Sequence, residues 1–225
     1  MEITVAKSAG FCYGVSRAVA LCESERKTGP LCTLGPIIHN KEVVNSLREK
    51  GVEPIHTLDE AGNRRVLLRS HGVAKSVYDA LEAAHIPYID GTCPNVQRIH
   101  RLVERAHAAG RQVIIVGDKN HPEVQGIDGW CENSAYILDT PGPVCLPGPG
   151  GTGLTGAEAR TVPCTLVSQT TLRHETFEAC VASLREQLFD LEVHDTICSA
   201  TAVRQAEAAK LAARVDKMIV IGDKE

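Results

Sequence analysis

Short apolar runs alternate with amphipathic stretches along most of this chain of 225 residues. The apolar runs predict strands at 3–6, 30–34, 65–70, 87–90, 112–117, 135–139, 164–169, 191–195 and 217–222. The stretches between them have helical periodicity and predict helices at 15–25, 41–51, 77–84, 96–110, 174–188 and 202–215. Because helices separate the strands, this order predicts an α/β fold with mostly parallel sheets that are covered by helices.

The composition is that of a globular protein and argues against two broad classes. Hydrophobic residues make up 43% of the chain and charged residues 23%, so the chain can bury a core. A net charge of −4 gives no sign of a nucleic-acid-binding surface. No apolar run reaches the roughly 18 residues of a membrane-spanning helix, and the first residues lack the layout of a signal peptide. We therefore expect a cytoplasmic protein without nucleic-acid or membrane partners.

The segment 141–161 interrupts the alternation because it is rich in proline and glycine. Gly148 to Gly153 match the G-x-G-x-x-G pattern of dinucleotide-binding proteins. That pattern is informative where it follows a strand and opens a helix, whereas in this chain it follows prolines. We therefore predict a mobile surface loop and no dinucleotide site.

Nine cysteines are many for a chain of this size. In a reducing compartment they are not expected to form disulfides, and without a C-x-x-C pair the usual zinc-ribbon spacing is missing. Most of them should act as small buried apolar side chains. We expect this of Cys22, Cys32, Cys145, Cys164 and Cys180, and we leave Cys131 open.

Three further cysteines share a position between a predicted strand and the helix that follows it. They are Cys12, Cys93 and Cys198, and each lies close to a predicted helix N-terminus. Backbone N–H groups and the helix dipole favour an anion there by about 0.3–1 kcal/mol, which favours a thiolate. Thiolates are the ligands that iron–sulfur clusters use. Three such positions therefore suggest one shared metal centre.

A shared metal centre has two alternatives that stay open at this point. The three thiols can be unrelated and buried, or they can belong to a zinc site with three cysteines and one histidine. If they do bind one cluster, three thiolates are fewer than the four that are usual in electron-carrying clusters. A metal with an open position can bind substrate and act as a Lewis acid, so the count favours catalysis over simple electron transfer.

Three histidines also follow strand-like runs, namely His39, His71 and His121. Imidazoles grouped with helix N-termini form a pocket for an anion such as a diphosphate, which carries a charge of about −3 at neutral pH. The alternative for each histidine is an ordinary hydrogen bond in a loop. Glu123 could supply a proton from the edge of such a pocket if burial raises its pKa, although it is equally explained as a first-turn helix residue.

Taken together, these residues resemble one family. The matching blocks are AGFCYGVSRAV, GPIIHNKEVV, RSHGV, DGTCPNVQRIH, HPEVQG, SQTTL and DTICSAT, in this order between residues 9 and 201. The ordered set is similar to the 4-hydroxy-3-methylbut-2-enyl diphosphate reductases, the IspH/LytB family of the methylerythritol phosphate pathway of isoprenoid biosynthesis. The resemblance implies three pseudo-repeated α/β lobes around a central cavity, which we place at 13–94, 95–190 and 191–225 with 1–12.

The resemblance also implies roles for the residues singled out above. One 4Fe–4S cluster, with one iron that has no protein ligand, would be bound by Cys12, Cys93 and Cys198. Contacts with the substrate would come from His39, His71, His121 and Thr170. Glu123 would be the proton donor, close to Thr170.

The reaction that the resemblance implies is reductive removal of the allylic hydroxyl of 4-hydroxy-3-methylbut-2-enyl diphosphate. The products would be isopentenyl diphosphate and dimethylallyl diphosphate, and ferredoxin or flavodoxin would be the electron donor. Two competing interpretations are a non-catalytic metal-binding or redox-sensing module and a zinc hydrolase. Metal analysis separates iron from zinc, and substrate-dependent oxidation of a reduced dye separates an enzyme from a sensor.

The chain departs from the family pattern at its end. After the run 217–222 the family continues with a loop rich in serine and asparagine, and later a further serine, which bind the diphosphate. This sequence ends instead with Asp223, Lys224 and Glu225. We therefore expect a truncated third lobe that exposes apolar surface, and a substrate site without part of its anion pocket.

Overall fold

The computed structural model describes residues 2–221, and the chain divides into two compact units. The first unit comprises Met1–Ser70, His85–Cys93 and Cys198–Glu225, and the second comprises His71–Ala84 and Pro94–Ile197. Each unit contains one four-stranded sheet in which every pairing is parallel. The predicted α/β fold with parallel sheets is thereby confirmed, whereas the division into three lobes stays a prediction.

The sheet of the first unit has the strand order β2-β1-β3-β4. Its strands are β1 (Leu31–Leu34), β2 (Glu53–Ile55), β3 (Arg65–Leu68) and β4 (Tyr88–Asp90). Helix α1 (Tyr13–Glu25) buries residues four apart, Gly14, Ala18 and Cys22, which form a single apolar stripe. This stripe and Leu47 of α2 (Lys41–Glu49) pack against buried side chains of the sheet such as Leu67.

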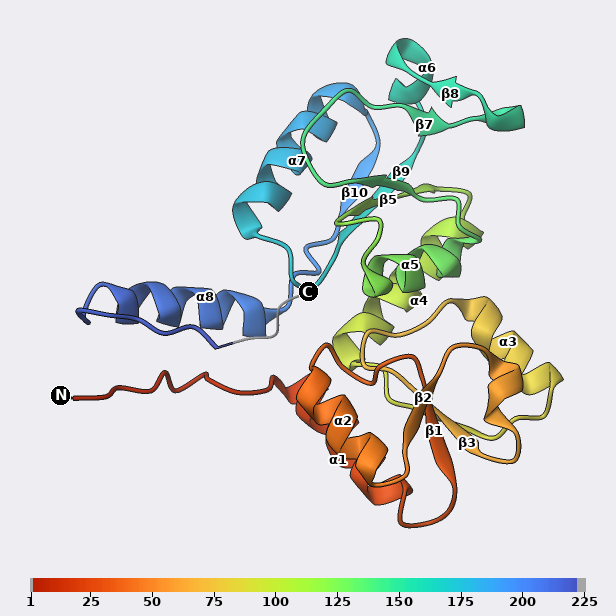
Figure 1. The fold of residues 1–225 in the computed structure, drawn as a ribbon. Helices are drawn as coiled ribbons and strands as arrows, with labels where there is room; N and C mark the ends of the chain where they lie inside the picture. Colours follow the sequence, from red (N-terminus) through yellow and green to blue (C-terminus); the bar gives the residue numbers. More distant parts are fainter. Residues whose placement is uncertain (1, 222–225) are drawn as a thin grey trace. The chain divides into compact units, whose positions relative to one another are not determined.

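The sheet of the second unit has the strand order β10-β9-β5-β6. Its strands are β5 (Gln112–Val116), β6 (Tyr136–Leu138), β9 (Cys164–Ser168) and β10 (Leu191–Val193). Side chains alternate between the two faces of a strand. Ile114 of β5 therefore packs in one cluster with α7 (His174–Gln187), and Ile115 packs in another with α4 (Pro94–Ala108) and α5 (Pro122–Asp128). Figure 1 shows the resulting layers, with α7 on one face and α4 and α5 on the other.

The two sheets share one topology. In each, the first and third strands along the chain are neighbours at the centre, the second strand flanks the first, and the fourth flanks the third. Connections therefore diverge between β1 and β3, and again between β5 and β9. In open parallel sheets, ligands bind beyond the carboxyl ends of the strands at such a switch point. The loops that follow β1, β3, β5 and β9 are thus the places where functional side chains are expected.

Two of the predicted strands are not formed. Residues 3–6 and 217–221 are not in strands and join no sheet in the described part of the chain, and Gly222, the last residue of the second predicted strand, lies outside the described residues. A strand needs a neighbour for its backbone hydrogen bonds, and neither segment pairs with one. Their apolar side chains are exposed, 76% for Ile3 and 85% for Ile219, but within the described residues neither segment forms the expected sheet surface.

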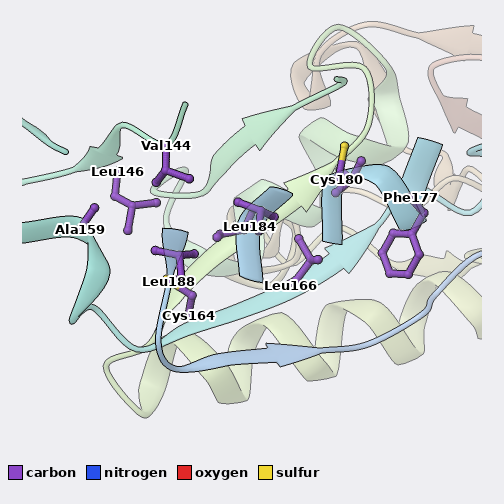
Figure 2. Close-up of a cluster of buried hydrophobic side chains, with 11 residues drawn as sticks. Val144, Leu146, Ala159, Cys164, Leu166, Phe177, Cys180, Leu184 and Leu188 are labelled. Carbon is purple, nitrogen blue, oxygen red and sulfur yellow. The ribbon is translucent and has the colours of Figure 1, made fainter. Parts of the chain in front are cut away.

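The proline- and glycine-rich segment 141–161 is more ordered than predicted. It contains the antiparallel pair β7 (Leu146–Pro147) and β8 (Gly153–Leu154) and the helix α6 (Gly156–Arg160). Val144, Leu146 and Ala159 are buried in the cluster that α7 covers, as Figure 2 shows. Gln187 of α7 also accepts a hydrogen bond from the backbone N–H of Val144 at 2.8 Å. The surface-loop prediction was wrong because a few apolar residues within this composition complete the core.

All six predicted helices are formed, with ends within three residues of the predicted ones. The two not yet mentioned are α3 (Lys75–Ala83) in the second unit and α8 (Ser199–Ala212) in the first. Short 3-10 helices lie at Leu58–Ala61, Gly129–Cys131 and Pro149–Gly151. Across residues 2–221, no helix has both the length and the apolar character needed to cross a bilayer.

Candidate functional site

The predicted site residues that follow strands occupy matching loops of the two sheets. Each loop after a first strand carries a histidine, each loop after a third strand carries a histidine or a threonine, and each segment after a fourth strand carries a cysteine. In chain order they are His39, His71 and Cys93 after β1, β3 and β4, and His121, Thr170 and Cys198 after β5, β9 and β10. The repeated topology thus places residues of similar chemistry at the carboxyl ends of both sheets.

Glu123 and Thr170 form a buried polar pair in the second unit. The backbone N–H of Thr170 donates to Oε1 of Glu123 at 2.6 Å, and the Thr170 hydroxyl lies 2.7 Å from Oε2. Glu123 is 3% exposed and Thr170 is 7% exposed. Because the two residues follow the neighbouring strands β5 and β9, the pair spans the switch point of this sheet.

Burial raises the pKa of Glu123 above its ordinary value, and the two hydrogen bonds from Thr170 lower the pKa by less. Removing a carboxylate from water disfavours its charged form, whereas hydrogen-bond donors favour it. Glu123 therefore keeps its proton to a higher pH than an exposed carboxyl group does. A carboxyl group held in this way is suited to act as a proton donor.

The start of α5 fixes His121 relative to Glu123. His121 is the N-cap residue, and its Nδ1 accepts a hydrogen bond from the backbone N–H of Glu123 at 3.1 Å. Pro122 occupies the first turn, where its missing N–H costs nothing. Since Nδ1 accepts, a neutral His121 carries its proton on Nε2, which is then a donor for an anion.

The structure brings two of the three predicted histidines together. The rings of His71 and His121 are 6.0 Å apart between centroids, with an interplanar angle of 77°. His39 is an exposed residue of the first unit, directly before Asn40, which caps α2 by accepting the N–H of Val43 at 2.9 Å. The grouping of His39 with the other two histidines stays a prediction.

The three candidate cluster ligands belong to the first unit and lie, as predicted, at the N-termini of helices. Cys12 is the N-cap of α1, Cys198 is the N-cap of α8, and Cys93 directly precedes α4. All three side chains are partly exposed. The segment before Cys12 is held against α8, because the Glu207 carboxylate accepts the N–H of Lys7 at 2.7 Å.

Cys93 packs closely against the first turn of α1. A Cβ atom on Gly14 would lie 2.5 Å from Sγ of Cys93, so only glycine fits at this position of the helix that Cys12 caps. Arg17, one turn later in α1, donates from Nη1 to the carbonyl oxygen of Thr92 at 3.2 Å. These contacts fix the turn that presents the Cys93 thiol next to α1.

No three histidine, cysteine or acidic side chains within residues 2–221 converge closely enough to hold a metal ion. The joint binding of one cluster by three thiolates therefore stays a prediction. The donors nevertheless fit an iron–sulfur cluster, because cysteine thiolates are its usual ligands and all three cysteines are partly exposed.

Five of the remaining cysteines are buried and unsuited to bind metal. They are Cys22, Cys32, Cys131, Cys164 and Cys180. Burial raises the pKa of each thiol, to about 11 for Cys22 and Cys164 and to about 12 for Cys131. They stay protonated at neutral pH and act as small apolar side chains.

Cys145 is exposed, which corrects the expectation that it is buried. It lies between Val144 and Leu146, whose side chains are both in the core. Successive side chains of an extended segment point to opposite sides, so the residue between two buried neighbours faces solvent.

The comparison with known families decides the classification. The model of the family described as LytB protein matches residues 3–225. The chain belongs to the LytB family. The 4-hydroxy-3-methylbut-2-enyl diphosphate reductase of Clostridioides difficile (strain 630) is 40% identical over 227 residues, which span all of this chain and 78% of that protein. The enzyme of the same name from Geobacter sulfurreducens is 41% identical over 227 residues, which span 99% of this chain and 75% of that protein.

Solved structures support the LytB assignment. A structure of (E)-4-hydroxy-3-methyl-but-2-enyl diphosphate reductase, described as the terminal enzyme of the non-mevalonate pathway, is 37% identical with a TM-score of 0.76. It matches 99% of this chain, and the match covers 77% of that structure. The Plasmodium falciparum reductase has a TM-score of 0.80 at 25% identity, covering 91% of this chain and 63% of that structure.

Sequence reasoning missed three residues that contact or adjoin the candidate site residues. Gly14 and Arg17 lie in the block around Cys12, and Gln169 lies in the block SQTTL. Each stood inside a motif that had been recognised, but the partners of Gly14 and Arg17 are more than 70 residues away. A local sequence pattern does not predict contacts between residues so far apart. The only available signal was that these residues lie within the matching blocks.

Proposed function

We propose that this LytB-family chain reduces 4-hydroxy-3-methylbut-2-enyl diphosphate by removing its allylic hydroxyl. The observation that carries this proposal is the buried Glu123–Thr170 pair, in a chain whose relatives bear the name of that reductase. A carboxyl group with a raised pKa beside a hydroxyl group is a proton source at the end of a parallel sheet. The products are isopentenyl diphosphate and dimethylallyl diphosphate.

The cofactor of this proposal is a 4Fe–4S cluster with one iron that lacks a protein ligand. Cys12, Cys93 and Cys198 would hold it, since they are partly exposed and lie at helix N-termini. When bound, the cluster supplies the electrons for the reduction and a Lewis acid for the hydroxyl. Ferredoxin or flavodoxin delivers the electrons, and we place the enzyme in the cytoplasm.

The diphosphate is bound by the histidines in this proposal. His71 and His121 are close together, and the hydrogen bond that His121 accepts on Nδ1 places the proton of the neutral ring on Nε2, the kind of donor that binds phosphate oxygens. His39 adds a third imidazole. Hydrogen bonds to charged oxygens are stronger than neutral ones, so a few imidazole donors can anchor the substrate.

Glu123 supplies a proton in the proposed reaction. The conversion consumes two electrons and two protons, releases the hydroxyl as water and leaves the second proton on carbon. Thr170 holds both carboxyl oxygens of Glu123, so the proton is presented from a fixed position. A positioned acid typically contributes about 10²–10⁴-fold to the rate.

The test uses the protein purified without oxygen. We expect iron at about four atoms per chain, with little zinc. Addition of the substrate should oxidise a reduced viologen dye and yield the two five-carbon diphosphates, detected by mass spectrometry. A zinc-loaded protein, or an iron-loaded one that neither oxidises the dye nor forms these products, would overturn the proposal.

A further inference from the structure

We infer that Gln169 is a positioning residue that sets the geometry of the Glu123–Thr170 pair. Its side chain crosses the switch point of the second sheet and joins the loop after β9 to the loop after β5. This inference rests on the proposed function for its effect on turnover, whereas its effect on Glu123 itself can be measured without turnover.

Gln169 lies one residue beyond β9 and is 8% exposed. Its backbone N–H donates to the carbonyl oxygen of Val116, the last residue of β5, at 2.9 Å. Its side-chain Oε1 accepts the N–H of Asp118 at 3.1 Å, and its Nε2 donates to Oγ1 of Thr171 at 2.9 Å. The Oε1 end of this buried amide therefore joins the two loops, and the Nε2 end fixes the side chain within its own loop.

These hydrogen bonds belong to a network around the Glu123 carboxyl group. In this network the carbonyl oxygen of Asp118 accepts the N–H of His121 at 2.9 Å. His121 accepts the N–H of Glu123, and the Glu123 carboxyl group is held by Thr170, the neighbour of Gln169. The carboxyl group is thus fixed from both sides of the switch point. Networks of this kind hold a polar group more firmly than single hydrogen bonds do.

The position of the Gln169 side chain requires a glycine at residue 117. A Cβ atom on Gly117, the residue after β5, would lie 2.9 Å from Cβ and Oε1 of Gln169 and 2.9 Å from Cγ2 of Val124. Such distances are shorter than packed carbon atoms tolerate. Gly117 therefore makes room for the crossing side chain.

The first sheet repeats this arrangement with a different residue. Gly35 follows β1 and Arg69 follows β3, at the places that Gly117 and Gln169 occupy in the second sheet. A Cβ atom on Gly35 would lie 3.1 Å from Nη1 of Arg69. A long polar side chain thus passes over a glycine at both switch points. In the second sheet this side chain is a neutral amide, which adds no positive charge that would favour ionisation of Glu123.

The main test is Gln169→Met, which keeps the volume and removes both side-chain hydrogen bonds. We expect kcat to fall about tenfold with KM nearly unchanged, because a small displacement of a catalytic group is costly. The basic limb of the pH–rate profile should move to higher pH. Weaker hydrogen bonds from Thr170 lower the pKa of Glu123 less, while burial still raises it.

A second variant guards against a folding defect. Gln169→Glu has the same shape and keeps the acceptor for Asp118, but it places a negative charge close to Glu123. It should move the basic limb in the same direction. The matched control is Gln125→Met, at an exposed glutamine of α5, which should behave as the parent protein does.

The same variants are compared without turnover, by infrared titration of the iron-free chain. The carboxyl band of protonated Glu123, identified by its loss in Glu123→Gln, should persist to higher pH in both Gln169 variants and not in the control. This shift would support the inference even if the parent protein showed no reductase activity. Gln169 variants whose Glu123 titrates as in the parent protein would overturn it.

Discussion

The carboxyl ends of the two sheets have one topology but are tied together differently. In the first sheet the ties are between backbone groups: the Ser70 N–H donates to the carbonyl oxygen of Ile37 at 3.1 Å, and the Ser70 carbonyl oxygen accepts the N–H of Cys93 at 2.9 Å. In the second sheet the side chains of Glu123 and Gln169 add ties to one backbone hydrogen bond, from the Gln169 N–H to the carbonyl oxygen of Val116. A tie between backbone groups tolerates many side chains, whereas a tie made by a side chain depends on one specific residue.

Replacement of the candidate ligand thiols should have the largest effect. We expect Cys12→Ser, Cys93→Ser and Cys198→Ser each to lose most of the iron and nearly all activity, because the hydroxyl group does not replace a thiolate ligand. Cys145→Ser is the control, since Cys145 is exposed and lies outside the predicted ligand set. Iron per chain, measured after anaerobic purification, decides the outcome. Full iron content in Cys93→Ser would show that the segment after the fourth strand of the first sheet supplies no ligand for iron.

Glu123→Gln should cost about 10²–10⁴-fold in kcat, since the amide cannot donate the proton. The same substitution should raise the free energy of unfolding relative to the parent protein. The folded-state pKa of Glu123 is raised, so its contribution to stability is fully present below the unfolded pKa of about 4.3 and is lost as pH rises through the folded pKa.

Glu123→Gln does not lose stability in this way as pH rises. The difference in free energy of unfolding between the variant and the parent protein should therefore grow from pH 4 toward neutral pH. Urea unfolding at a series of pH values measures the difference between the two proteins. A difference that does not change with pH would mean that burial does not disfavour the ionised form of Glu123.

Removal of Arg17 should have a moderate effect on the first sheet. Arg17→Ala loses the hydrogen bond to the carbonyl oxygen of Thr92, which is worth about 1.5 kcal/mol for a charged donor. We expect a severalfold faster loss of iron to a chelator, with partial recovery in Arg17→Lys. Lys27→Ala is an exposed control just beyond α1. Unchanged iron release in Arg17→Ala would show that backbone bonds alone hold the Cys93 turn.

The smallest effect is expected at Asn40, beside His39. Asn40→Ala removes the N-cap of α2 and should lower the free energy of unfolding by about 1 kcal/mol. Asn40→Ser should restore most of it. Iron content should not change, because the backbone ties through Ser70 remain. A large loss of iron would show that the loops of the first sheet depend on side chains as well.

The central strands were predictable from the sequence, because β1, β3, β5 and β9 are buried apolar runs. The same signal at 3–6 and 217–221 gave wrong predictions, since an apolar run does not specify which neighbour supplies its hydrogen bonds. The edge strand β2 was missed for the opposite reason. It contains Pro54 and only one buried residue, as an edge position permits.

The sequence supplies a list of candidate site residues, but it predicts only part of their arrangement. The predicted helix starts placed Cys12, Cys93 and Cys198 correctly, because the pattern that marks the start of a helix is local. The contact of Glu123 with Thr170 joins residues 47 positions apart, and the crossing of Gln169 depends on the sheet order. Such information lies in the pairing of strands and not in any one motif.

The burial of five cysteines determines how the native protein responds to thiol reagents. Those five thiols are shielded from solvent and protonated, so an alkylating agent should not modify them until the chain unfolds. Of the nine cysteines, only Cys12, Cys93, Cys145 and Cys198 reach solvent. The mass added by a brief pulse of reagent therefore reports cofactor loading: four labels on the iron-free protein, and one, on Cys145, when the other three thiols hold iron.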